Sequence, residues 1–120
     1  MIIVIDDNKD ITDLTCRLLN VMGYEATPAL SGEEGIAKAK TRKPEIILCD
    51  IGMEGMNGYD VAEYIRRDDE LKDTYLIAIS GYSSPKDIKH SIKAGFNKHL
   101  VKPINLDTLK QILAEVYVSS

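Results

Sequence analysis

The feature that most constrains the fold is a strict alternation of short apolar runs with helix-like segments, repeated five times along 120 residues. Three runs are continuous and apolar, which is typical of strands buried on both faces. These runs cover 2–5, 46–49 and 75–79, and two weaker ones cover 25–30 and 99–101. Pro28 lies inside the second run and indicates an edge strand, because proline cannot donate a hydrogen bond to a neighbouring strand.

A helix is predicted after every run. The first carries an apolar stripe at Ile11, Leu14, Leu18 and Met22 and ends at Gly23. The second begins with the capping-box sequence of 31–34 and ends near Thr41, the third covers 58–67, the fourth starts at Ser84-Pro85, and Asn105 caps the fifth. The side chains expected to face the core are Ile36, Ala37 and Ala39; Val61, Ala62 and Ile65; Ile88 and Ile92; and Leu106, Leu109, Ile112, Leu113 and Val116. With only two apolar side chains on its inward face, the fourth helix is expected to be among the less tightly held elements.

Strand–helix alternation with buried strands predicts a parallel sheet with helices on both faces and right-handed crossovers. For five strands this favours the flavodoxin-like (βα)5 three-layer sandwich with strand order 2-1-3-4-5. That order places the three most apolar runs in the centre and the proline-containing run at an edge. Residues 1–120 are therefore predicted to form a single domain.

Composition excludes several classes of function. A content of 44% hydrophobic and 28% charged residues is that of a globular protein. The net charge of −4 comes without a basic stripe, so no nucleic-acid partner is expected. No apolar run approaches the ~20 residues of a membrane span and no signal segment opens the chain, so no membrane contact is expected. Cys16 and Cys49 lie in apolar segments and are expected to be buried, reduced thiols, which favours a cytoplasmic protein.

Polar side chains stand where four of the five predicted strands end. They are Asp6 and Asp7, Asp50, Ser80 and Lys102. Parallel strands bring these ends to one edge of the sheet, where three carboxylates cannot all ionise cheaply beside one lysine. A hard divalent cation such as Mg²⁺ would balance them. A metal, a lysine and a hydroxyl around Asp50 predict chemistry on a phosphoryl group, with Asp50 as its acceptor.

Each of these residues also has a plainer interpretation. Asp6 and Asp7 could be a helix cap and its solvated neighbour, Asp50 and Ser80 could be turn residues, and Lys102 could be a surface charge. Four independent coincidences at one edge are improbable, so the joint placement favours a functional site.

Five blocks of sequence closely resemble the receiver domain of two-component response regulators, over essentially the whole chain. They are Ile3-Val4-Ile5-Asp6-Asp7-Asn8, Asp50-Ile51-Gly52-Met53, Gly55-Met56-Asn57-Gly58-Tyr59, Ile79-Ser80-Gly81-Tyr82 and Leu100-Val101-Lys102-Pro103. The sequences of segments 81–82 and 94–103 look most like those of receiver domains attached to hybrid sensor histidine kinases. The resemblance implies a phosphoacceptor signalling domain rather than an enzyme, with a sensor histidine kinase or a phosphotransfer domain as partner, self-association left open, and no output domain in this chain.

The resemblance also implies a role for each site residue. Asp50 would accept the phosphoryl group from a phosphohistidine, and Asp7, Asp50 and the backbone carbonyl of Gly52 would ligate Mg²⁺. Asp6 would act mainly through water. Ser80 would donate its hydroxyl to the phosphoryl oxygens. Lys102 would pair first with Asp50 and then with the phosphoryl group, and its bond to Pro103 is expected to be cis.

Some positions depart from the commonest family pattern. Glu54 stands where the family usually has proline, Gly52 has no side chain to position a hydrolytic water, and Tyr82 is bulky. At the position of His99, many receiver domains have a Tyr or Phe that rotates inward when the hydroxyl at the position of Ser80 moves. Its two interpretations are a switch residue that acts with Ser80 and a solvent-facing residue of an edge strand, the second slightly favoured. Phosphorylation is expected to bias a two-state arrangement of the Ser80 loop, the fourth helix and the His99 strand.

Two other functions fit the predicted fold. A haloacid-dehalogenase-like phosphohydrolase could use Asp50 as nucleophile, but it usually carries a second Asp two residues on, where this chain has Gly52. A flavodoxin-like FMN carrier needs a phosphate loop rich in Ser, Thr and Gly. The corresponding loop here, 6–8, is Asp-Asp-Asn and would repel phosphate in the absence of a metal.

Overall fold

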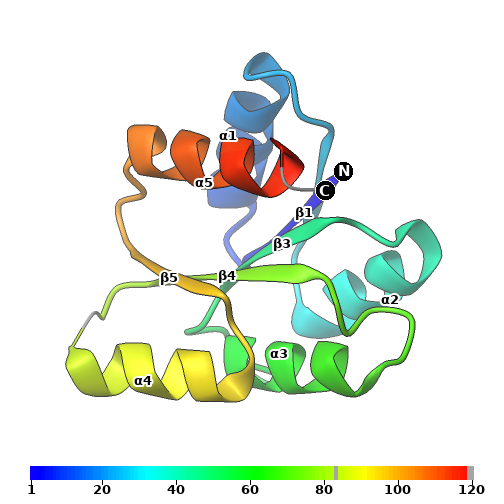
Figure 1. Ribbon diagram of the computed structural model, residues 1–120, viewed down its shortest axis with the longest axis vertical. Coiled ribbons are helices and arrows are strands. Elements are labelled where there is room, and N and C mark those ends of the chain that lie inside the picture. The colour runs from blue at the N-terminus through cyan, green and yellow to red at the C-terminus, as the bar shows by residue number, and fades with distance from the viewer. Residues whose placement is uncertain (83, 119–120) are drawn as a thin grey trace.

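A computed structural model describes residues 1–82 and 84–118 as a parallel sheet between two layers of helices (Figure 1). The strands are β1 (Ile2–Ile5), β2 (Ala26–Ala29), β3 (Ile46–Asp50), β4 (Tyr75–Ser80) and β5 (Lys98–Val101). The helices are α1 (Lys9–Val21), α2 (Gly32–Arg42), α3 (Gly58–Arg67), α4 (Pro85–Ala94) and α5 (Leu106–Val118). The alternation predicted from the sequence is confirmed, with bounds that shift by one or two residues.

The strand order is β2-β1-β3-β4-β5, and every pair is parallel, as predicted. The central strands β1 and β3 are buried along their whole length. Pro28 lies in β2 at the edge of the sheet. The flavodoxin-like architecture is therefore confirmed, and it brings the carboxyl ends of all five strands to one edge.

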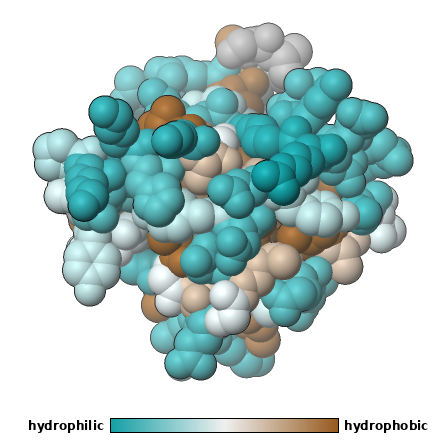
Figure 2. All heavy atoms as spheres, turned by 90° about the horizontal axis from the view of Figure 1, so that it is seen from below, coloured by the Kyte–Doolittle hydropathy of each residue, from teal (hydrophilic) through white to brown (hydrophobic). Residues whose placement is uncertain are grey.

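Side chains alternate between the two faces of the sheet and form two separate cores. One core joins the sheet to α2, α3 and α4 and includes Ile47 and Ile65. The other joins the sheet to α1 and α5 and includes Leu48 and Leu109. Figure 2 views the molecule from the side of α3 and α4, where hydrophilic side chains cover most of the face and hydrophobic ones are scattered between them.

The predicted apolar stripe of α1 is not its core face. The helix instead buries Thr12, Cys16 and Leu19. Ile11 and Leu14 are exposed, at 38% and 58% of their surface. The apolar residues of α1 span a wider arc of the helix than the sheet can cover. The uncovered part, with Ile11 and Leu14, lines a groove between α1 and the neighbouring α5.

The core residues predicted for α4 are also wrong, although its start at Ser84-Pro85 is confirmed. Ile88 and Ile92 are 39% and 49% exposed, and the buried residues of the helix are Ser91 and Ala94. The helix lies over β5, the short edge strand, and turns its narrow small-residue face inward. Two smaller corrections concern Ala37 and Leu106, which are exposed because each lies on the rim of its helix's buried face.

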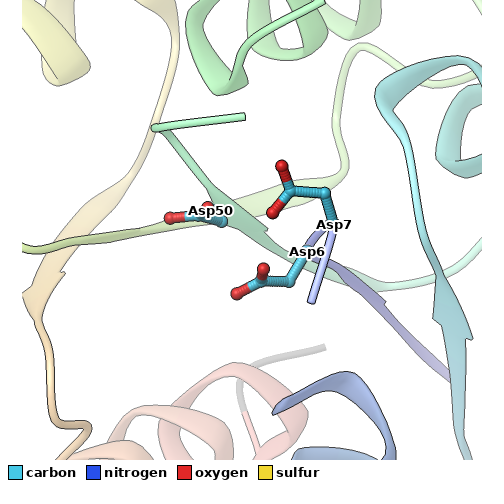
Figure 3. Close-up of side chains that lie close together, drawn as sticks. All are labelled: Asp6, Asp7 and Asp50. Atoms are coloured by element: carbon cyan, nitrogen blue, oxygen red, sulfur yellow. The ribbon is translucent and has the colours of Figure 1, made fainter. Parts of the chain in front are cut away.

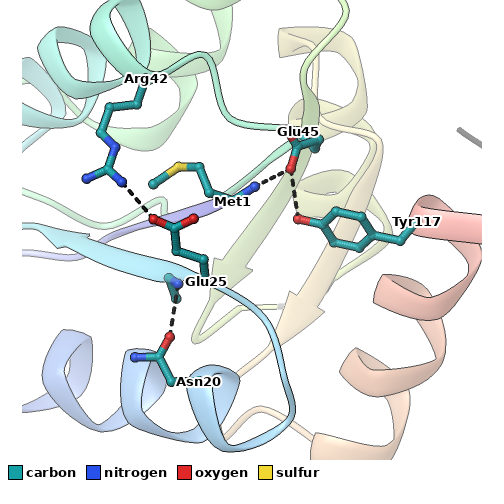
Figure 4. Close-up of polar contacts among 7 residues, drawn as sticks. Met1, Asn20, Glu25, Arg42, Glu45 and Tyr117 are labelled. Atoms are coloured by element: carbon teal, nitrogen blue, oxygen red, sulfur yellow. Dashed lines mark hydrogen bonds and ion pairs between the residues drawn. The ribbon is translucent and has the colours of Figure 1, made fainter.

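Polar contacts tie the amino-terminal ends of the strands together (Figure 4). The hydroxyl of Tyr117 donates to Glu45, 3.2 Å away, just before β3, and the amino group of Met1 pairs with the same carboxylate. Arg42 pairs with Glu25 before β2 at 2.8 Å. These contacts fix the edge of the sheet opposite to the strand ends that carry Asp6 and Asp50. None of the described helices is long and apolar enough to cross a membrane.

Candidate functional site: an acidic cluster at the carboxyl edge of the sheet

The register of the sheet decides which strand-end side chains meet. Ile5 pairs with Cys49 and Ile79 pairs with Asp50, so Asp6 and Asp50 project to the same face, the one covered by α1 and α5. Lys102 follows β5 at a position that projects to this same face, two residues after Leu100, the partner of Ile79. Its Nζ atom lies 3.1 Å from Oδ1 of Asp50 and 3.5 Å from Oδ2 of Asp6.

Three carboxylates form a cluster at this edge (Figure 3). Asp6, Asp7 and Asp50 each offer one oxygen atom, and these atoms all lie within 4.8 Å of one another. Asp6 and Asp50 are buried, at 4% and 7% exposure, whereas Asp7 is exposed at the rim. The predicted convergence of the acidic residues is therefore present, with one open side toward solvent.

The charges at the site are unbalanced. Burial raises the pKa of Asp6, partly offset by the backbone N–H of Asn8 that donates to it over 3.0 Å, and the charge of Asp50 raises the pKa further. The pKa of Lys102 is lowered by burial, but the hydrogen bond and charge of Asp50, with the charge of Asp6, raise it overall. One ammonium faces three carboxylates, so the donor set suits a hard divalent cation such as Mg²⁺.

The loop after Asp50 is held by the start of α3. A side chain at Gly58 would place its Cβ 2.7 Å from Cα of Ile51 and 2.8 Å from the carbonyl oxygen of Asp50. Only glycine allows the helix to approach the backbone this closely. Asn57 and Asp60 form a reciprocal capping box that fixes the first turn. Gly52 is exposed in this loop, two residues after Asp50.

Ser80 lies at the same edge but starts from the opposite face of the sheet. It follows Ile79, the partner of Asp50, and strand alternation directs it toward the α3–α4 side. Its hydroxyl is buried and accepts a hydrogen bond from the backbone N–H of Tyr82 at 3.0 Å. In the described part of the chain it makes no hydrogen bond to Asp50. The peptide bond between Lys102 and Pro103 is cis, as expected.

His99 is not the solvent-facing residue that the sequence slightly favoured. Its ring is half-buried, and both of its nitrogens are hydrogen-bonded. Nδ1 lies 2.9 Å from the hydroxyl of Ser91 in α4, and Nε2 lies 2.9 Å from the carbonyl oxygen of Tyr82. The correction has a physical reason, since α4 packs over β5 and presents a buried hydroxyl to the ring.

Three features of the site were not predicted from the sequence. One is the backbone N–H of Asn8, whose side chain also caps α1 by accepting from the N–H of Ile11 at 3.2 Å. Another is the contact of Ser91 with His99, because nothing in the sequence distinguishes this serine from others in helices. The third is an apolar cleft of about 530 Å³ between α1 and α5, which opens onto Asp6, Asp50 and Lys102. Only the residue type of Asn8, a good helix cap after a strand, carried a signal.

Cys16 and Cys49 are both free and buried, as predicted. Burial raises the pKa of the Cys16 thiol to about 11, so it stays protonated near neutral pH.

Comparison with known proteins decides which family uses this arrangement. The family model for the response regulator receiver domain matches residues 2–114. The chain belongs to this family. It is a receiver domain of two-component signalling, the class of phosphoacceptor domains that bind Mg²⁺ at an acidic cluster and interact with histidine kinases or phosphotransfer proteins.

The similar proteins include a sensor kinase and small response regulators. The CAI-1 autoinducer sensor kinase/phosphatase CqsS of Vibrio cholerae is 33% identical over 109 residues, which are 90% of this chain but 16% of that protein. The polar-differentiation response regulator DivK of Brucella anthropi is 26% identical, with 95% of this chain and 96% of that protein covered. The structure of the chemotaxis protein CheY4 of Vibrio cholerae superimposes on this receiver domain with a TM-score of 0.89, at 29% identity and 96% coverage of each chain.

Proposed function

We propose that Asp50 is the phosphoacceptor of this receiver domain and takes the phosphoryl group from a phosphohistidine. One observation carries this proposal: a buried carboxylate at the end of a central strand, 3.1 Å from a lysine ammonium and beside two further carboxylates. Neither rival function explains that set. Gly52 lacks the second carboxylate of a haloacid-dehalogenase-like site, and the acidic residues 6–7 occupy the place of a flavin phosphate loop.

The transfer is a substitution at phosphorus. A carboxylate oxygen of Asp50 forms the new P–O bond as the P–N bond of the donor breaks, and the electron pair of that bond stays on the donor imidazole. Lys102 stabilises the negative charge on the phosphoryl oxygens, since it is already held at Asp50. The Ser80 hydroxyl then donates to the same oxygens.

Mg²⁺ fits the acidic cluster by charge and by donor type. The carboxylates of Asp7 and Asp50 and the backbone carbonyl of Gly52 would hold the ion, and Asp6 would act through water. When bound, the ion supplies positive charge that neutralises the phosphoryl oxygens. Without it, the cluster carries an excess of two negative charges, which would repel an incoming phosphoryl group.

The proposal extends to the partner and the setting of the domain. The partner is a sensor histidine kinase or a phosphotransfer domain, and residues 1–120 act as one cytoplasmic receiver domain. The sequences of segments 81–82 and 94–103 favour attachment to a hybrid kinase. The domain accepts a phosphoryl group and is not an enzyme with a substrate of its own. Phosphorylation biases Ser80, α4 and His99 between two arrangements.

Labelling with acetyl phosphate tests the acceptor. The wild type should form a hydroxylamine-sensitive phosphoryl adduct in Mg²⁺, seen by intact-protein mass spectrometry, and Asp50→Asn should not. Asp7→Asn is the matched control for the metal, because it keeps the acceptor and should lose most of the labelling at low Mg²⁺. Equal labelling of the wild type and of Asp50→Asn would contradict the assignment.

A further inference from the structure

The cleft between α1 and α5 has the size and the lining of a small-molecule site. Its volume is about 530 Å³, within the range of about 300–1,000 Å³ that ligand pockets occupy. Leu19, Leu48 and Leu109 line its floor, and all three are buried in the core between the sheet and these two helices. Figure 1 shows α1 and α5 side by side on this face of the sheet. The cleft is therefore built on the core of the domain.

The walls of the cleft leave apolar side chains in contact with water. Ile11 and Leu14 of α1 and Leu106 of α5 line it, and their exposed fractions are 38%, 58% and 45%. Between Ile11 and Met22, which also lines the cleft, the chain rises roughly 16 Å at the pitch of an α-helix. Removal of apolar surface from water is favourable. A ligand with an extended apolar body would therefore gain free energy along the cleft.

The charged groups of the cleft are gathered at one end. Asp6, Asp50 and Lys102 line the end that meets the acidic cluster. The ammonium of Lys102 is already engaged, because it lies 3.1 Å from Asp50 and 3.5 Å from Asp6. Two carboxylates beside one ammonium leave a net negative charge, and Asp7 at the rim of the cluster adds another. This end of the cleft therefore attracts a cationic group and repels an anionic one.

We propose that the cleft binds a cationic amphiphile, a molecule with an apolar chain and a terminal amine. The chain lies between α1 and α5, and the ammonium lies at Asp6 and Asp50. A primary amine carries its charge at neutral pH, as the side chain of lysine does. The two parts of the molecule then match the two parts of the cleft, the apolar walls and the acidic end.

The placement of the ammonium has a consequence for the metal. The ammonium balances the same carboxylates that Mg²⁺ would balance, so the amphiphile and the ion compete for the cluster. Through this competition the amphiphile would oppose phosphorylation of Asp50. That consequence rests on the proposed function, whereas binding of the amphiphile in the absence of the metal does not.

Titration calorimetry with n-octylamine in EDTA tests the site. Octylamine should bind about tenfold more tightly than octan-1-ol, which has the same chain without the charge, because hydrogen bonds to charged groups are stronger than neutral ones. Octanoate, with the opposite charge, should bind more weakly than both. Each methylene removed from the amine should weaken binding about threefold. Equal binding of the amine and the alcohol, or no binding of the amine, would overturn the proposal.

Exposed substitutions locate the apolar chain. Leu14→Ser and Leu106→Ser shorten the walls of the cleft and should each weaken octylamine binding about fivefold. Val21→Ser is the matched control, because Val21 is 85% exposed on the same helix as Leu14 but outside the lining of the cleft. Unchanged binding by both leucine variants would overturn the proposal. Should either variant not fold, methyl NMR of the wild type decides, because octylamine should shift the signals of Leu14 and Leu106 and not those of Val21, and the reverse pattern would overturn the site.

Two further measurements locate the ammonium. Asp6→Asn should weaken octylamine binding and Lys102→Met should tighten it, each about fivefold, because one removes an opposite charge and the other a like charge. Saturating Mg²⁺ should weaken binding by the wild type about tenfold or more. If both variants bound the amine equally, or if bound Mg²⁺ left its affinity unchanged, the ammonium would not lie at the cluster and the proposal would fail. A wild type that binds octylamine but not Mg²⁺ alone would instead refute the metal site of the proposed function and support the amine site.

Discussion

Removal of the one ammonium at the acidic cluster should destabilise the metal-free protein and leave the Mg²⁺-bound protein nearly unchanged. In Lys102→Met, two buried carboxylates lose a partner at 3.1 Å and 3.5 Å. At an effective dielectric constant of about 20, each contact has a gross Coulomb energy of about 5 kcal/mol. The lysine side chain is 33% exposed, and desolvation and lost side-chain entropy oppose the attraction.

The net loss in the free energy of unfolding should therefore be about 2 kcal/mol in EDTA. With saturating Mg²⁺ it should fall below about 0.5 kcal/mol, because the ion replaces the missing positive charge. Mg²⁺ should also bind more tightly to the variant, since a like charge beside it has gone. Urea denaturation followed by circular dichroism, in EDTA and in Mg²⁺, measures both effects.

Lys9→Met is the matched control. Lys9 pairs with Asp13 at 2.7 Å, but its side chain is 72% exposed, so its loss should leave the free energy of unfolding nearly unchanged with or without the metal. Equal destabilisation of Lys102→Met and Lys9→Met in EDTA, or a loss in Lys102→Met that Mg²⁺ does not reduce, would contradict this prediction.

Three other predictions concern groups around the site. Because burial raises the pKa of Asp6, the metal-free protein should lose stability as the pH rises from about 4 through that raised pKa, and Asp6→Asn should remove this part of the pH dependence in urea titrations at several pH values. Gly58→Ala should cost about 2 kcal/mol or more and slow phosphorylation by acetyl phosphate, because its Cβ would collide with the backbone of Asp50 and Ile51; wild-type stability and rate would contradict the close approach. Arg66→Lys should cost about 2–3 kcal/mol in thermal or urea unfolding, since the guanidinium donates to three backbone carbonyls and to one side-chain amide oxygen that a lysine could not reach together; a loss below about 0.5 kcal/mol would show that these bonds contribute little.

The fold could be predicted because its signals are local. Continuous apolar runs, helix caps such as Ser84 and Asn105, and Pro28 in a weak strand each act within a few residues, and each was confirmed. The faces of the helices were predicted less well. The stripe of α1 and the isoleucines of α4 are apolar but exposed, because burial depends on how much of a helix the neighbouring elements cover.

The sequence by itself determined the parallel sheet, the strand order and the meeting of Asp6, Asp7, Asp50 and Lys102 at one edge. It could do so because the alternation of strands with helices predicts parallel strands whose carboxyl ends share one edge, and this prediction needs no knowledge of any long-range contact. Only the tertiary structure decided that Ser80 starts from the opposite face and that His99 bridges the β4–α4 loop and α4. Those contacts join residues of separate elements, and their partners depend on how a helix packs over a strand, which no local pattern records.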